Sequence, residues 1–107
     1  MPPEIRLLLT TCPPEQAERL LAALLGERLI ACGNLVPTVH SRYWWQGSLC
    51  ADDEALIVME TAIDRVAAAM ARLAALHPYE VPKILTFAPS EVHLPYREWV
   101  HAVTRPA

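Results

Sequence analysis

Cys32 and His77 are the first candidates for binding a transition metal, and Glu80 could complete a site with them. Cys32 offers a thiol, His77 an imidazole and Glu80 a carboxylate, and copper and zinc prefer imidazole and thiolate ligands. The paired spacings typical of metal sites, such as Cys-x-x-Cys, His-x-His and His-x-x-x-His, do not occur in the sequence. A metal site containing these three residues would therefore have to be assembled in space, within one chain or between chains.

Each of these side chains also has an ordinary structural explanation. A single cysteine in a strand is commonly a small buried apolar residue, and His77 could fix the exit of a helix through a hydrogen bond. Cys12 lies near a predicted helix start, which could lower the pKa of its thiol and let it scavenge metal or oxidant. Its alternative role is that of a partly buried helix cap. The other histidines have no matching partner and are expected at the surface: His40, His93 and His101.

Tyr79 and Glu80 stand between two prolines, which make this connector extended and rigid. They could line a cleft between subunits, with Trp45 or Trp99 as its apolar wall. An enzyme would need a recognisable catalytic pattern, such as Gly-x-Ser-x-Gly, a glycine-rich phosphate loop or paired carboxylates, and none is present. We therefore expect a protein that is not an enzyme.

Composition excludes several other classes of protein. With 107 residues, 53% of them apolar, the chain is expected to form a single domain, residues 1–107, with a real core. A net charge of -3 without a lysine or arginine cluster argues against nucleic acid as a partner. No secretion signal or membrane-spanning stretch is recognisable, so we expect a cytoplasmic protein that does not contact membranes. Three widely spaced cysteines argue against a disulfide framework.

The element that must position the candidate groups is a long predicted β-hairpin from Leu29 to Thr61, with its turn at Gln46-Gly47-Ser48. The outgoing arm, Ala31 to Trp45, would extend roughly 50 Å, whereas a globule of this length has a radius of gyration of about 13 Å. The hairpin must therefore bend or project from the body. Pro37 cannot donate a hydrogen bond to a neighbouring strand, so a bulge there, on an edge strand, is the expected bend.

The tip of this hairpin carries Tyr43, Trp44 and Trp45. Each indole has on the order of 200 Å² to bury, which corresponds to at most about 5 kcal/mol. Leaving both indoles in water is unfavourable, so we expect the tip to dock on another copy of the chain.

The remaining segments complete an α+β fold. Apolar runs bounded by prolines predict strands, and apolar residues at helical spacing predict helices. Thr61 and Asp64 resemble a capping box at the start of the second helix. The predicted elements outside the hairpin are strands at Ile5–Thr11 and Lys83–Ala88, and helices at Pro13–Arg28, Ala62–Leu76 and Leu94–Val103. This order predicts a ferredoxin-like sandwich (βαββαβ) with both main helices on one sheet face and an extra C-terminal helix.

Several short motifs occur in a fixed order along nearly the whole chain. They are Ala31-Cys32-x-Asn34 followed by Pro37, Tyr43-Trp44-Trp45-x-Gly47, Glu60-Thr61, His77-Pro78-Tyr79-Glu80-Val81-Pro82 and Tyr96-x-x-Trp99. In this order and spacing the chain resembles the CutA divalent-cation tolerance proteins.

The resemblance implies a tight homotrimer of ferredoxin-like subunits, built by long hairpins that pair edge to edge around a three-fold axis. It also implies a role in tolerance of copper and other divalent cations, without an established enzymatic reaction. The chain departs from the family pattern at Gly33, Cys12 and Cys50. Thr10 stands where some members carry a cysteine, so a thiolate ligand from that strand is not expected here.

Two classes of function remain open from the sequence. One is a homotrimer that responds to metals and binds copper or another divalent cation. The other is a trimeric small-molecule or anion sensor of the PII-like type, which has the same subunit architecture and uses clefts between subunits. Such a sensor usually needs a basic phosphate-binding patch, and this chain has one lysine, Lys83.

Overall fold

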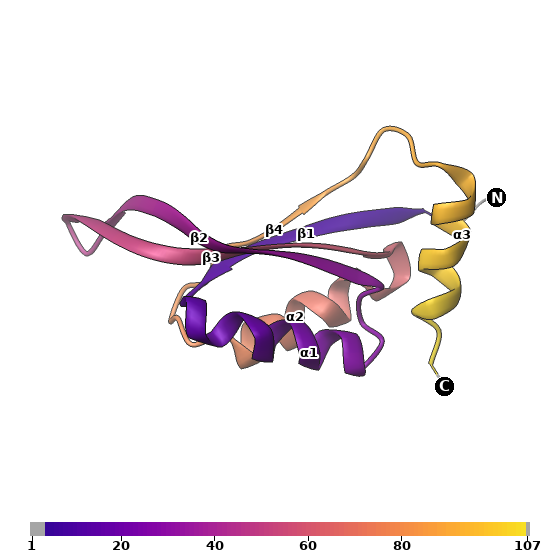
Figure 1. Cartoon of the computed structure of the whole chain (residues 1–107), viewed down its shortest axis with the longest axis horizontal. Helices are drawn as coiled ribbons and strands as arrows, with labels where there is room; N and C mark the ends of the chain where they lie inside the picture. The colour runs from indigo at the N-terminus through magenta and orange to yellow at the C-terminus, as the bar shows by residue number, and fades with distance from the viewer. Residues whose placement is uncertain (1–3, 107) are drawn as a thin grey trace.

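A four-stranded antiparallel sheet with two helices on one face forms the body of the protein (Figure 1). The computed structural model describes residues 4–106. Residues 1–3, on which the expectation of no secretion signal partly depends, lie outside this range. The elements are β1 (Ile5–Cys12), α1 (Ala17–Gly26), β2 (Cys32–Trp45), β3 (Ser48–Ala62), α2 (Val66–Leu76), β4 (Ile84–Phe87) and α3 (Leu94–Val103). The strand order β2-β3-β1-β4 confirms the predicted ferredoxin-like α+β sandwich.

Both main helices start later than the sequence predicts. Each is preceded by a 3-10 turn, Pro14–Gln16 before α1 and Ile63–Arg65 before α2. The predicted capping box is also wrong, because neither turn has a side-chain cap. Thr61 instead lies within β3, where its buried hydroxyl donates to the carbonyl oxygen of Leu29 at 2.7 Å. Helix α3 has the bounds that the sequence predicts.

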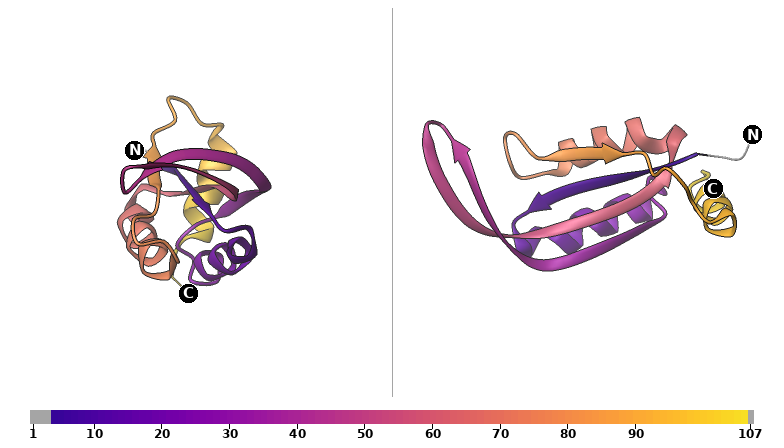
Figure 2. Two further views of the ribbon diagram at one scale, coloured as in Figure 1. Left: turned by 90° about the vertical axis from the view of Figure 1, so that its left-hand side faces the viewer. Right: turned by 90° about the horizontal axis from the view of Figure 1, so that it is seen from above.

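The hairpin of β2 and β3 both bends and projects, as its length requires (Figure 2). The strand register shifts between Val36 and Val39, which places the irregularity at Pro37 on the edge strand β2. Gln46 and Gly47 form a two-residue turn in which both residues have positive φ, 50° and 79°. Such turns match the natural twist of paired strands. The projecting hairpin helps to extend the protein to 47 × 28 × 22 Å.

The main core lies between the sheet and helices α1 and α2. Leu8, Ile57 and Met59 are fully buried on the helix side of the sheet, and Leu20 and Leu73 are fully buried on the helices. A second, smaller core joins the start of the sheet to α3, where Ile5, Ala31 and Val100 are buried together. Helix α3 therefore covers one end of the sheet.

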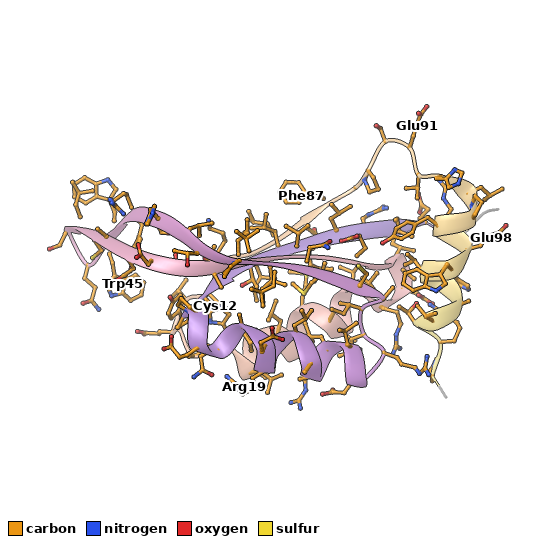
Figure 3. The ribbon with its side chains drawn as sticks, in the orientation of Figure 1. Cys12, Arg19, Trp45, Phe87, Glu91 and Glu98 are labelled. Carbon is orange, nitrogen blue, oxygen red and sulfur yellow. The ribbon has the colours of Figure 1, made fainter. Side chains whose placement is uncertain are left out.

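The sheet face opposite α1 and α2 has no helix over most of its length (Figure 1). We call this the open face and define it by alternating apolar residues of four strands, which are Leu7, Leu9, Val36, Leu56, Val58, Leu85 and Phe87. Leu85 and Phe87 are 46% and 49% exposed, and Phe87 points away from the two helices (Figure 3). A continuous apolar sheet face of this kind is unusual in a protein that stays monomeric.

Within residues 4–106, no helix has the length and apolar character needed to cross a membrane.

Candidate functional site

The outer part of the hairpin, from Ser41 to Trp45, and the connector after α2 line a groove of about 730 Å³. We call it the hairpin groove and define it by its lining residues, which are Thr11, Ser41, Arg42, Tyr43, Trp44, Trp45, Glu54, Pro78, Tyr79, Glu80, Val81 and Lys83. The groove thus combines aromatic walls with carboxylates and two basic side chains. Its volume lies in the range of small-molecule sites, about 300–1,000 Å³.

His77 fixes the connector against the sheet. Its Nδ1 accepts a hydrogen bond from the backbone N–H of Tyr79 at 3.1 Å, and its Nε2 donates to the carbonyl oxygen of Thr11 at 2.8 Å. The residue is 7% exposed and sits at the C-terminal end of α2. Both ring nitrogens are therefore occupied, and His77 makes the kind of hydrogen bond at the helix exit that its structural role predicts. A metal could bind His77 only by displacing one of these hydrogen bonds.

Glu54 lies in the wall of the groove and is 5% exposed. The hydroxyl of Tyr79 donates to Glu54 Oε2 at 2.8 Å. Burial, and then this hydrogen bond, raise the pKa of Tyr79, so its phenol keeps its proton to a higher pH than an ordinary tyrosine. Within residues 4–106 no basic side chain forms an ion pair with Glu54. The groove therefore contains a buried carboxylate that lacks a positive partner.

Sequence reasoning missed Glu54 because its partner, Tyr79, is 25 residues away in the chain. The usable signal was the alternation of β3, in which Glu54, Leu56 and Val58 occupy every second position and so share one face. A carboxylate in that apolar series needs a specific partner.

Glu80, Tyr79 and Trp45 line the same groove of one protomer; that this cleft lies between subunits stays a prediction. Trp99 does not line it, because α3 packs at the other end of the sheet, against Ile5 and Ala31. Trp44 is 70% exposed at the hairpin tip. The apolar wall of the groove in one protomer is therefore supplied by the hairpin.

Two further hydrogen bonds stiffen the hairpin near the groove. Tyr43 donates its hydroxyl to Asp52, and this bond raises the pKa of Tyr43 to about 12. His40 Nδ1 lies 2.6 Å from Asp53 Oδ1 across the two strands. His40 lies at the surface, as the sequence predicts.

Cys32 lies far from His77 within one protomer. It pairs with Glu60 across the hairpin, and Glu60 pairs on its other side with Leu7, whereas His77 contacts Thr11. Leu7 and Thr11 are four residues apart on β1, which corresponds to roughly 13 Å along the sheet. The structure therefore does not bring Cys32 together with His77 and Glu80 in one chain.

The surroundings of Cys32 are polar on one side. Tyr96 donates its hydroxyl to Glu60 Oε1 at 2.9 Å, and Glu60 Oε2 is buried without a hydrogen-bond partner. Burial, followed by the bond to Glu60, raises the pKa of Tyr96, with a smaller contribution from Cys32. Cys32 itself is half-buried and packs against the small core under α3.

Cys12 is not a reactive thiol. It is fully buried beside the start of α1, and burial, with the nearby charge of Glu54, raises its pKa. The suggested lowering of its pKa is wrong because burial disfavours the thiolate more than the helix start favours it. The alternative role of a partly buried helix cap is wrong too, because Cys12 is fully buried and the turn that follows has no side-chain cap. All three cysteines are unpaired, and residues 4–106 contain no cluster of three or more histidine, cysteine, aspartate or glutamate side chains able to hold a metal.

The hydrogen bond from Tyr79 to Glu54 predicts sensitivity to alkali. Because the pKa of Tyr79 is raised in the folded protein, the unfolded chain loses this proton first once the pH exceeds about 10. The stabilisation is complete below pH 10 and is lost as the pH rises toward the folded pKa. In Tyr79→Phe, we expect the free energy of unfolding to fall less steeply with pH above pH 10. The difference in slope should correspond to about one proton fewer released on unfolding. Urea unfolding from pH 8 to 11 measures this slope, and equal slopes in both proteins would contradict the assignment.

Comparison with known proteins identifies sequence relatives over almost the whole chain. The sequence profile of a family described as CutA1 divalent ion tolerance protein matches residues 6–103. The divalent-cation tolerance protein CutA of Thermus thermophilus is 38% identical over 99 residues, 92% of this chain and 96% of that protein. Protein CutA of Mus musculus is 34% identical over 105 residues, 97% of this chain. The match spans only 59% of the length of the mouse protein.

Solved structures of similar proteins have the same fold. The crystal structure of the divalent ion tolerance protein CutA1 from Ehrlichia chaffeensis superposes with a TM-score of 0.91 at 35% identity, covering 96% of this chain and 97% of that one. A protein of Nostoc described as PII-like protein CutA, in its apo form, gives a TM-score of 0.90 at 31% identity, covering 95% and 99%.

Proposed function

Because the chain belongs to the CutA1 divalent ion tolerance family, we propose that it is a non-enzymatic homotrimer that acts in tolerance of divalent cations. In this proposal it binds copper or another divalent cation. The observation that carries the cation part is the buried carboxylate of Glu54 in the hairpin groove.

A buried carboxylate is costly unless a positive charge or several hydrogen bonds compensate it. Glu54 receives one hydrogen bond, from Tyr79, and neither Arg42 nor Lys83 of the groove is ion-paired with it. Glu80 lines the same groove and adds a second carboxylate. A divalent cation between these carboxylates would supply the missing positive charge.

The predicted metal ligands Cys32, His77 and Glu80 enter this proposal in different ways. Glu80 lines the same groove as Glu54. His77 supports the groove wall through its bond to Tyr79. Cys32 could join them only from a second protomer, because it lies at the other end of the sheet in its own chain.

The homotrimer is supported by surfaces that one chain leaves uncovered. The open face is apolar and half-exposed, and the hairpin tip exposes Trp44 and Leu49 to 70% and 69%. Strand β2 is an edge strand along the whole hairpin. In the proposed trimer, Tyr43, Trp44 and Trp45 of one subunit contact the next, and the open faces meet inside.

We further place this single domain, residues 1–107, in the cytoplasm. The supporting observation is that Cys12, Cys32 and Cys50 are all unpaired, as expected where thiols are kept reduced.

Metal titrations test the proposal. In calorimetric titrations with Cu(II) and Zn(II), Glu54→Gln and Glu80→Gln should each weaken binding by at least about tenfold, because each removes a charged ligand. Cys32→Ser should weaken binding only if a second protomer completes the site. Glu18→Gln, an exposed carboxylate at the start of α1, is the matched control and should leave binding unchanged.

The same titrations at pH 7.5, 6.0 and 5.0 identify the ligand type. A site that uses an imidazole should lose most affinity between about pH 7 and 5.5, whereas a carboxylate site should keep it until about pH 4.5. Equal copper affinity in wild type, Glu54→Gln and Glu80→Gln would refute a cation site in the groove.

A second function is favoured by the size and lining of the groove. Its volume of about 730 Å³ and its aromatic walls, together with Arg42 and Lys83, would suit a small organic molecule or anion. This would make the protein a PII-like sensor of a small molecule. Titration with ATP separates the two functions: heat of binding with ATP that Arg42→Gln removes, without a response to metals, would favour the sensor.

A further inference from the structure

A second, smaller cleft lies at the opposite end of the molecule from the hairpin tip, where the connector from β4 arches over the start of β1 toward α3 (Figure 1). Its volume is about 200 Å³. We call it the arginine cleft and define it by its lining residues, which are Glu4, Ile5, Arg6, Pro89, Ser90, Val92 and Arg97. These residues come from the start of β1, the connector and α3, so the fold itself brings them together.

One of the two guanidinium groups of the arginine cleft has a buried donor without a partner. Arg97 Nε is buried and has no hydrogen-bond partner. Arg6 donates from Nη1 to the carbonyl oxygen of the preceding residue, Ile5, at 2.9 Å. Neither arginine forms an ion pair within residues 4–106. A buried donor without an acceptor is unfavourable, and most of all on a charged group.

The acidic residues around the cleft do not neutralise it. Glu91, at the top of the arch, and Glu98, on the outer side of α3, both point away from the body (Figure 3). Asp64 is held by Arg105 through two bonds of 2.6 Å. Among the described residues, Glu4 is the carboxylate that lines the cleft, together with Arg6 and Arg97, so this part of the lining carries more positive than negative charge.

We infer that the arginine cleft binds a small tetrahedral oxyanion, either inorganic phosphate or the phosphoryl group of a larger molecule. The fork of N–H donors on a guanidinium matches two oxygens of such an anion, and the hydroxyl of Ser90 is a further donor in the lining. A cleft of about 200 Å³ is smaller than the usual 300–1,000 Å³ of organic ligand sites. It accepts the anionic group and leaves the rest of a larger ligand outside. This inference is independent of the cation proposed for the hairpin groove.

Titration of the intact protein with inorganic phosphate, in a buffer free of phosphate and sulfate, tests the site. Arg97→Gln and Arg6→Gln should each weaken binding by about tenfold or more, because each removes charge-assisted hydrogen bonds. Arg65→Gln is the matched control, since Arg65 also has a buried Nε without a partner but does not line the cleft. It should leave phosphate binding unchanged.

A measurement on the unmutated protein covers the case in which a variant fails to fold. Phosphate should shift the side-chain Nε–H resonance of Arg97 in ¹H–¹⁵N spectra, with a smaller effect on that of Arg65. Phenyl phosphate binding more tightly than inorganic phosphate would assign the cleft to a phosphoryl group of a larger ligand, and the reverse order would assign it to the free ion. Acetate binding as tightly as phosphate, or no shift of Arg97 at millimolar phosphate, would overturn the inference.

Discussion

Phe87→Asp should convert the protein in solution from three associated chains to one. Phe87 is 49% exposed on the open face of β4, so a charge there disturbs little within one protomer. In a trimer whose open faces meet, the carboxylate would be buried without a partner in every subunit, at a cost of several kcal/mol each. Light scattering of the purified protein at micromolar concentration measures the mass.

Thr86→Asp is the matched control because Thr86 is the neighbouring residue of β4 and points to the opposite sheet face. It is also exposed, and this variant should keep the mass of the wild type. If Phe87→Asp kept the wild-type mass as well, the open face would not be the association surface. A wild type that is monomeric at micromolar concentration would refute the trimer itself.

His77→Ala should lower the free energy of unfolding by about 2–4 kcal/mol. The change leaves two backbone groups without their partners, the carbonyl oxygen of Thr11 and the N–H of Tyr79. A buried group deprived of its partner costs about 1–3 kcal/mol. The connector would also lose its attachment to β1, so the shape of the hairpin groove should change. Urea unfolding monitored by circular dichroism measures the loss.

His93→Ala is the control for this experiment, since His93 is exposed just before α3. Its effect should stay within about 0.5 kcal/mol, as is usual for surface substitutions. If His77→Ala were equally mild and yet abolished copper binding, His77 would be a ligand rather than a structural residue.

The order of elements was predictable because each signal is local. Pro37 marks the bulge in β2, Gly47 marks the turn, and Pro95 marks the first turn of α3. Apolar alternation and helical spacing then supply the remaining elements. The predicted starts of α1 and α2 were too early because a proline or an acidic residue suits the start of a 3-10 turn as well as that of an α-helix.

The candidate site was less predictable because its contacts are distant in sequence. Glu80 was found from its motif, and it does lie on the groove. Glu54 was missed because burial and a bond to Tyr79 arise only when β3 meets the connector. The occupied nitrogens of His77 depend likewise on Thr11, 66 residues away. The residue type suggests what a side chain could do, but the fold decides which of its atoms remain free.

Both outer strands of the sheet, β2 and β4, have an unpaired edge. An association of β2 of one copy with β4 of the next would be head-to-tail, so every added copy would present a fresh edge for another. Whether such growth closes into a ring or continues as a fibre depends only on the rotation between neighbouring copies. The irregularity at Pro37 interrupts the regular ladder of β2 and increases its twist. The long edge is therefore neither straight nor continuous, and bulges of this kind are one of the ways in which proteins limit edge-to-edge growth.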